Sequence, residues 1–123
     1  MIKKDIKLSD HARTQLLTMK RRTGIQNWNV LCRWAFCLSM EEKAIPPPEN
    51  IPADSPVEMN WSTFAGRYEN VYWALLITRA QRDGIELSED ALNSYFRLHL
   101  HRGISYLHSR VTGDVSDLLR LVA

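Results

Sequence analysis

The stretch KRRTGIQNWNVLCRWAF, residues 20–36, joins a basic run, a glycine and an amphipathic segment. Cations are common at the end of a helix, because they complement the negative end of its dipole. Gly24 suits the left-handed residue that follows many helices, and Asn27 or Asn29 can cap a second helix. The stretch therefore predicts one helix ending and another beginning within about five residues. The cations at this junction are Lys20, Arg21 and Arg22.

Before the junction, residues 2–8 alternate apolar and charged side chains, which is typical of a short strand. A lone strand exposes unpaired backbone groups, so it needs a partner, and a second copy of the chain is one candidate. Ser9 or Asp10 can cap the helix that follows. The apolar stripe expected for this helix is formed by Ala12, Leu16, Leu17 and Met19.

After the junction, an apolar face indicates a helix that ends near residue 43. Residues 44–58 hold all five prolines of the chain and predict a semi-extended connection lying on the surface. A short strand or turn is expected before Gly66. The members of the apolar face are Val30, Leu31, Trp34, Ala35, Cys37 and Leu38.

The remaining sequence predicts two longer helices. The first contains the apolar run 71–77, ends near Asp83, and is expected to be central and buried on several sides. Ser88 caps the second, in which Gly103 marks a close approach of another element. A weak amphipathic turn or two is expected in residues 114–123. The predicted fold is one mainly α domain over residues 1–123: a strand and helix-turn-helix (1–43), the proline-rich connection (44–58) and a helical part (59–123).

Charge is distributed unevenly along the chain. Residues 1–43 hold nine Lys or Arg against four Asp or Glu, whereas residues 44–90 hold three against eight. The N-terminal third is therefore where a polyanion would bind. No apolar run reaches the roughly 18–20 residues of a membrane span, and the N-terminus lacks a signal-peptide pattern, so we expect no membrane association and a cytoplasmic location.

Two interpretations of the 20–27 junction stay open from spacing alone. A helix start offers free backbone N–H groups, and three neighbouring cations would complete a clamp for nucleic-acid phosphates. The cations alternatively serve only to stabilise the helix that they end. The strand–helix–turn–helix order is also that of a ribbon-helix-helix module, whose strand pairs with its twin and reads the major groove. In that case Lys3 and Lys7 would face DNA, although Asp5 between them fits poorly.

No catalytic or metal site is predicted. His99, His101 and His108 share one helix without metal-ligand spacing, so surface or capping roles are expected. Cys32 and Cys37 lie five residues apart, and their side chains diverge by about 140° on a helix, so no disulfide is expected. Both are assigned to the apolar face, because free cysteine is often buried.

Four segments resemble the DndE family of DNA sulfur-modification proteins, and the agreement extends over about residues 6–108. They are KRRTGIQNWNVLCRWAFCLS (20–39), VEMNWSTFAGRY (57–68), ALLITRAQRDG (74–84) and FRLHLHRGISYL (96–107). The resemblance implies a role in DNA phosphorothioation, in which sulfur replaces a non-bridging phosphate oxygen. It also implies a small non-catalytic member, without a cofactor, that binds duplex DNA, including nicked DNA, as a homo-oligomer beside the other proteins of the system.

The sequence and the resemblance together predict backbone contacts to double-stranded DNA by a dimer or tetramer. The main contacts are expected from Lys20, Arg21 and Arg22, with Gly24 and Asn27 shaping the turn; further contributors are Lys3, Lys4, Lys7 and Arg33. The alternatives are a ribbon-helix-helix repressor and a sulfur-handling enzyme that uses Cys32 and Cys37.

Overall fold

The computed structural model describes residues 1–122. Its mainly helical architecture, in which a short N-terminal strand is followed by helices, confirms the predicted fold class. Of the two longer helices expected in the second half, only the one at Glu89–Arg110 is longer than the helices before it. The elements in order are β1 (Ile6–Lys7), α1 (Asp10–Thr23), α2 (Trp28–Glu41), β2 (Glu58–Met59), α3 (Trp61–Ala65), the 3₁₀ helix η1 (Gly66–Tyr68), α4 (Glu69–Arg82), α5 (Glu89–Arg110) and α6 (Ser116–Arg120).

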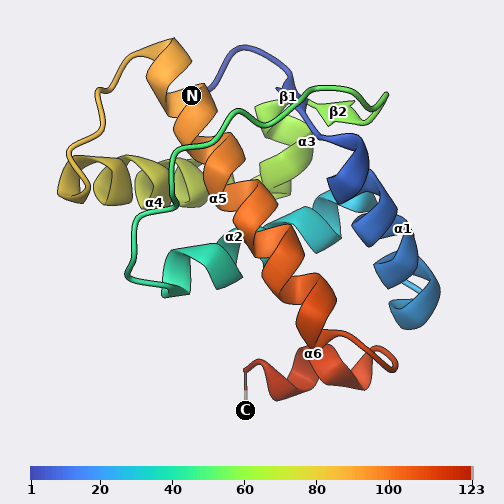
Figure 1. The fold of residues 1–123 in the computed structure, drawn as a ribbon. Coiled ribbons are helices and arrows are strands. Elements are labelled where there is room, and N and C mark those ends of the chain that lie inside the picture. The colour runs from blue at the N-terminus through green and yellow to red at the C-terminus, as the bar shows by residue number, and fades with distance from the viewer. Residues whose placement is uncertain (123) are drawn as a thin grey trace.

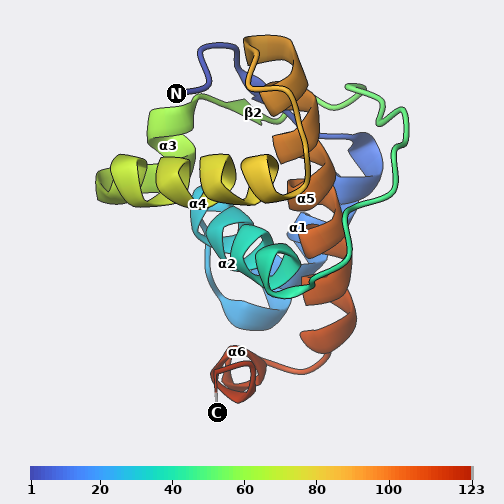
Figure 2. The same cartoon turned by 90° about the vertical axis from the view of Figure 1, so that its left-hand side faces the viewer.

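The long helix α5 forms the axis around which the other elements pack (Figures 1 and 2). It contacts α2 most extensively and α1 next. Gly103 lies where α5 meets α2, and a methyl group built on it would stand 1.8 Å from the carbonyl oxygen of Ala35. The predicted close packing at Gly103 is therefore confirmed, because no side chain fits there.

Helix α1 begins and ends with the predicted signals. The Ser9 hydroxyl accepts from the N–H of Ala12 at 3.1 Å, and Gly24 has a left-handed φ of 77°. The N–H of Gly24 donates to the carbonyl of Lys20 at 2.9 Å, which satisfies one free carbonyl at the helix end. The expected apolar stripe is buried except at Leu17, which is 38% exposed.

The partner of β1 comes from the same chain rather than from a second copy. β1 and β2 pair antiparallel, with Ile6 opposite Met59, and the N–H of Leu8 extends the ladder to Val57 at 3.1 Å. On the opposite edge of β1, Arg97 Nε donates to the carbonyl of Lys7 at 2.9 Å. Both edges of this short strand thus have partners within one molecule.

Two expectations for residues 58–83 differ from the structure. A short strand does precede Gly66, as β2, but residues 61–65 form the helix α3, and the side-chain carbonyl oxygen of Asn60 caps it by accepting from the N–H of Thr63 at 2.7 Å. Helix α4 is not central: Val71 is 56% and Leu75 is 42% exposed. An apolar run cannot by itself distinguish a core helix from one that carries an apolar face on the surface.

The proline-rich connection lies across α5 as a strap, residues 42–57 (Figure 1). Arginines of the second half hold its backbone. Arg79 donates to three consecutive carbonyls from Glu42 onward, and Arg97 donates to two near Ile51. Arg102 donates to the carbonyl of Ala44 at 2.8 Å. Carbonyls in a segment without regular structure are satisfied in this way by side chains.

Candidate nucleic-acid interface

The end of α1 and the start of α2 form a corner, defined here as residues 20–29. The last turn of α1 carries the three predicted cations, and the left-handed Gly24 turns the chain into α2. Nothing lies within 4 Å of the position that a Gly24 side chain would occupy, so the backbone is open to approach from outside.

Helix α2 starts at this corner with an open N-terminus. Asn27 is its N-cap residue but makes no side-chain hydrogen bond to the helix, and no acidic residue lies in the first turn. The first N–H groups of a helix have no partners within the helix, and the helix dipole places partial positive charge on them. The start of α2 therefore favours an anion.

The three cations of the corner differ in how they are held. Lys20 Nζ lies 3.8 Å from the ring centroid of Trp28, which fixes the ammonium beside the start of α2. Arg21 is exposed. Arg22 is half-buried, and its Nη1 donates to the carbonyl of Val111 at 2.9 Å, so it also binds the end of α5 to α1.

The other predicted contact residues lie away from the corner. Lys7 belongs to β1, and Lys3 and Lys4 precede it in the chain. All three lie at the start of α1, the opposite end from the corner, and the fourteen residues of α1 span about 21 Å. Lys4 Nζ is 2.6 Å from the carboxylate of Asp90. Arg33 Nη1 donates to the carbonyl of Phe64 at 2.8 Å, and so joins α2 to α3.

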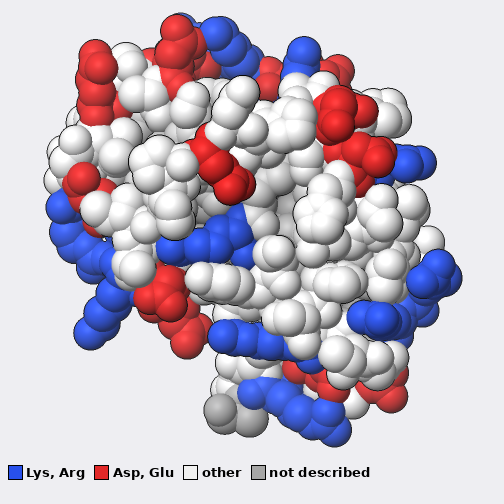
Figure 3. Space-filling view, viewed as in Figure 1, with Lys and Arg blue, Asp and Glu red and all other residues white. Residues whose placement is uncertain are grey.

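The distribution of charge on the surface agrees with this separation. In Figure 3, Lys and Arg side chains lie over the end of α1 and over α6, but also on the opposite side of this face; most Asp and Glu side chains lie in its upper half, and some lie beside α6. Lys3 and Lys4 lie close to the carboxylates of Glu89 and Asp90.

The two cysteines occupy different environments. Cys32 is buried as predicted, but Cys37 is exposed, so its assignment to the apolar face is wrong. Burial raises the pKa of the Cys32 thiol to about 12. Desolvation also raises the pKa of Cys37, and a hydrogen bond with Tyr72 offsets this only in part. Neither environment stabilises the thiolate that a nucleophile or sulfur carrier requires.

The histidines are more buried than predicted. His99 is fully buried, and its Nδ1 is 2.8 Å from the hydroxyl of Ser39. His101 does act in capping: its Nε2 accepts from the N–H of Ser9 at 3.1 Å, and its Nδ1 is 2.8 Å from the carbonyl of Arg97. Burial lowers the pKa of His99 to about 3 and that of His101 to about 4.

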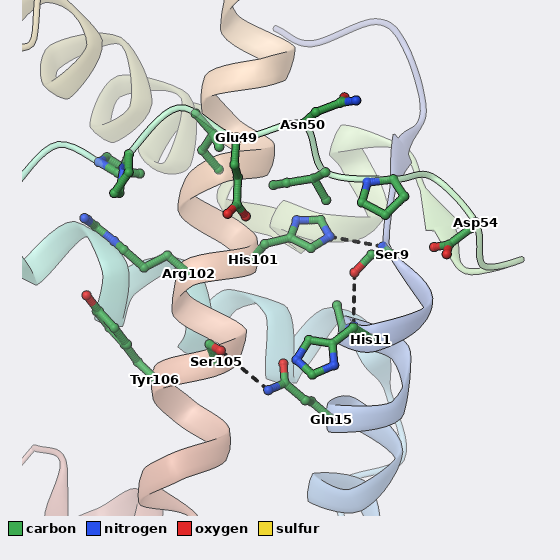
Figure 4. Close-up of a pocket in the computed structure, with 16 residues that line it drawn as sticks. Ser9, His11, Gln15, Glu49, Asn50, Asp54, His101, Arg102, Ser105 and Tyr106 are labelled. Carbon is green, nitrogen blue, oxygen red and sulfur yellow. Dashed lines mark hydrogen bonds between the residues drawn. The ribbon is translucent and has the colours of Figure 1, made fainter.

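A pocket of about 580 Å³, not expected from the sequence, lies between the strap, α1 and α5 (Figure 4). His101 and Arg102 line it, but their donors and acceptors are engaged by protein groups. Asp54 also lines it and accepts from the N–H of Asp10 at 2.7 Å. These residues come from separate segments without a common motif, so no sequence signal could have indicated the pocket.

By its fold and its corner, the chain is a small, mainly helical protein with a cationic junction between two helices. None of the described helices is long and apolar enough to cross a membrane. The family model "DNA sulphur modification protein DndE" matches residues 5–114, and the chain therefore belongs to the DndE family, which is involved in DNA phosphorothioation.

Solved structures support this membership. The chain is 25% identical to DndE from Escherichia coli B7A, described as involved in DNA phosphorothioation modification, with a TM-score of 0.73 over 87% of this chain and 98% of that one. A DndE mutant with two glycines replaced by lysine is 22% identical, with a TM-score of 0.66 over 86% of this chain and 99% of that one, and shows the shared fold. No curated protein matches the chain.

Proposed function

We propose that this chain is the non-catalytic, DNA-binding component of a DNA phosphorothioation system, acting in the cytoplasm as a homo-oligomer beside the other proteins of that system. It binds duplex DNA, including nicked duplexes, through backbone phosphates. The proposal rests on the corner, where Lys20 and the exposed Arg21 adjoin the open N-terminus of α2.

The chemistry of the corner matches that of a phosphodiester. Backbone N–H groups at a helix start donate to phosphate oxygens, and neighbouring cations neutralise the phosphate charge. Lys20 is held in place by Trp28, so it loses little freedom when it meets an anion. Arg22 supplies charge while it joins α1 to α5, and Gly24 lets the DNA backbone approach. The β1 lysines and Arg33 are secondary in this proposal, because Arg33 and Lys4 already have protein partners.

Binding through phosphates depends steeply on salt and little on base sequence. We expect Lys20→Ala with Arg21→Ala to weaken binding to a random-sequence duplex at least tenfold at low salt, as measured by fluorescence anisotropy. Lys43→Ala with Arg67→Ala removes the same charge from exposed sites elsewhere and serves as the control. Equal affinities of the two double variants would contradict the assignment of the corner.

A sequence-specific repressor is the first alternative. It would read bases through Lys3 and Lys7 on a strand shared between two copies, but β1 is already paired with β2 and bound by Arg97. Competition between unrelated duplexes separates the two functions. A repressor prefers its operator by about 4–10 kcal/mol, whereas the proposed function predicts similar affinities for all duplexes.

A sulfur-handling enzyme is the second alternative, and it depends on Cys32 and Cys37. Because both thiols have raised pKa values, we expect a Cys32→Ser, Cys37→Ser variant to support DNA modification in cells at the wild-type level. The measurement is the phosphorothioate content of genomic DNA, with the protein level checked in parallel. Loss of modification by the exposed Cys37→Ser change alone would favour the enzyme.

A further inference from the structure

Helix α4 presents an apolar side to solvent. It extends to the edge of the fold in both views (Figures 1 and 2). Val71, Ala74 and Leu75 are exposed on this side, and together with Asn70 and Thr78 they line a shallow groove of about 450 Å³, called here the α4 groove. Apolar side chains that gather in an exposed groove mark a site of interaction.

The shape of the α4 groove suits another helix. Side chains four residues apart form rows along a helix, and the rows of a second helix pack into the spaces between them. Val71 and Leu75 form one row, and Asn70, Ala74 and Thr78 form the next. Ala74 is small and lies in the middle of its row, so it lets another backbone come close. Grooves of this kind bind the apolar side of an amphipathic helix.

Both ends of the α4 groove are cationic. Arg67 lies about one helical turn before Val71, and Arg82 lies about three turns after it, so the two arginines flank the groove along the helix. Glu69, the one acidic residue of α4, is about 160° around the helix from Val71 and therefore lies on the opposite side.

The two arginines are available to a partner. Arg67 is exposed, and the side chain of Arg82 is 61% exposed although its Nε lies 3.9 Å from the carboxylate of Asp83. That carboxylate already accepts from Arg79 and Tyr95, so it leaves most of the Arg82 guanidinium free. The fifteen residues from Arg67 to Arg82 span roughly 22 Å, which is the length of a helix of about four turns.

A second copy of α4 does not match this arrangement of charge. Antiparallel pairing would bring Arg67 to Arg82, and parallel pairing would bring each arginine to its own twin, so like charges meet in either direction. We propose that the α4 groove receives an amphipathic helix of a different protein, with an apolar stripe along its middle and a carboxylate near each end. The inference rests on the proposed function, in which this chain acts beside the other proteins of a modification system, and the partner is one of those proteins.

A photo-crosslinker in the α4 groove tests what binds there. Thr78→p-benzoylphenylalanine keeps the apolar side chains of the groove, and Thr112→p-benzoylphenylalanine at another exposed threonine is the control. Each chain is produced in cells that carry the whole modification system. Light should join position 78, but not position 112, to another protein of that system. Mass spectrometry should place the joined peptide in an amphipathic helix with acidic residues near both ends.

The role of the arginines is tested in the same cells. Arg67→Glu with Arg82→Glu should lower the crosslink yield from position 78 by about tenfold or more, because like charges then face each other. Lys7→Glu with Arg110→Glu makes the same change of charge at exposed sites away from α4 and should leave the yield unchanged. Lysines in place of the partner's flanking carboxylates should restore the yield, and circular dichroism checks that each variant is folded.

The other outcomes contradict defined parts of the proposal. A crosslink from position 78 to a second copy of this chain, or to lipid, would overturn the proposed occupant. No crosslink at all, in cells whose DNA is modified, would overturn the α4 groove as a docking site. An unchanged yield in the Arg67→Glu, Arg82→Glu variant would contradict the role of charge. The purified variant should bind duplex DNA like the wild type, so a failure of DNA binding at the corner is detected separately.

Discussion

Gly103 shows how one residue determines the position of two helices. Because Gly103 has no side chain, α5 can approach the backbone of α2 closely. A methyl group added at Gly103 would lie 1.8 Å from the carbonyl oxygen of Ala35. We predict that Gly103→Ala lowers the free energy of unfolding by about 3 kcal/mol, because backbone atoms must move to accommodate the methyl group. Urea denaturation measures this change. Ser94→Ala, at an exposed position of α5, should change the stability by less than about 0.5 kcal/mol.

We predict that the free energy of unfolding falls in acid because two histidines are buried in the folded chain. The folded-state pKa values of His99 and His101 are lowered to about 3 and 4, chiefly by burial, from an unfolded value near 6.5. Below pH 6.5 the unfolded chain binds protons that the folded chain does not. Each histidine should therefore lower the free energy of unfolding by up to about 1.4 kcal/mol per pH unit down to its folded pKa.

Denaturation at pH 7.5 and at pH 5 tests the histidine prediction. His101→Gln keeps an acceptor for the N–H of Ser9 and should reduce the difference between the two pH values. His11→Gln, which changes an exposed histidine, is the control. An unchanged pH dependence in His101→Gln would show that this residue does not contribute.

At the level of elements, one helix is capped by a residue of another. The last turn of α2 carries no basic residue, but Arg79 of α4 donates to the carbonyl of Met40 at 3.0 Å and to the carbonyls of residues 42–44. Its Nε also lies 2.9 Å from the carboxylate of Asp83, and both side chains are 5% exposed. Arg79 thus supplies the charge that the C-terminus of α2 lacks.

Removal of Arg79 should be costly. Arg79→Ala would leave the buried carboxylate of Asp83 without its cation, although the hydroxyl of Tyr95 would still donate to it, and would leave several carbonyls without a donor. We therefore predict a loss of about 3 kcal/mol in the free energy of unfolding. Chemical denaturation monitored by tryptophan fluorescence measures it. Arg82→Ala, which removes a 61% exposed arginine of the same helix, should cost less than about 1 kcal/mol. Similar losses in the two variants would contradict the capping role.

The elements that could be predicted from the sequence are those set by local signals. Ser9, Gly24 and Ser88 mark helix boundaries through contacts within a few residues, so their patterns are readable along the chain. The partner of β1 and the exposed side of α4 depend on contacts between distant segments. The sequence shows where cations lie along the chain but not which groups they bind. Arg33 and Arg79, for example, both donate to carbonyls more than thirty residues away.

For the whole molecule, lysine and arginine divide their roles. The lysines lie in the first 43 residues, while several arginines of the second half bind the strap from within the fold. A guanidinium can donate to several carbonyls at once, which suits this internal role. The corner combines lysine and arginine at one end of the molecule, where the sequence predicts a phosphate site. The contact of the corner with DNA stays a prediction.

The salt dependence of duplex binding is the decisive measurement for the corner. Affinity for a random-sequence duplex should fall as salt rises, and Lys20→Ala with Arg21→Ala should reduce the slope of log affinity against log salt by about 0.9 for each phosphate that the variant no longer neutralises. The Lys43→Ala, Arg67→Ala control should keep the wild-type slope. An identical slope in the corner variant and the wild type would show that DNA, if bound, lies elsewhere on the molecule.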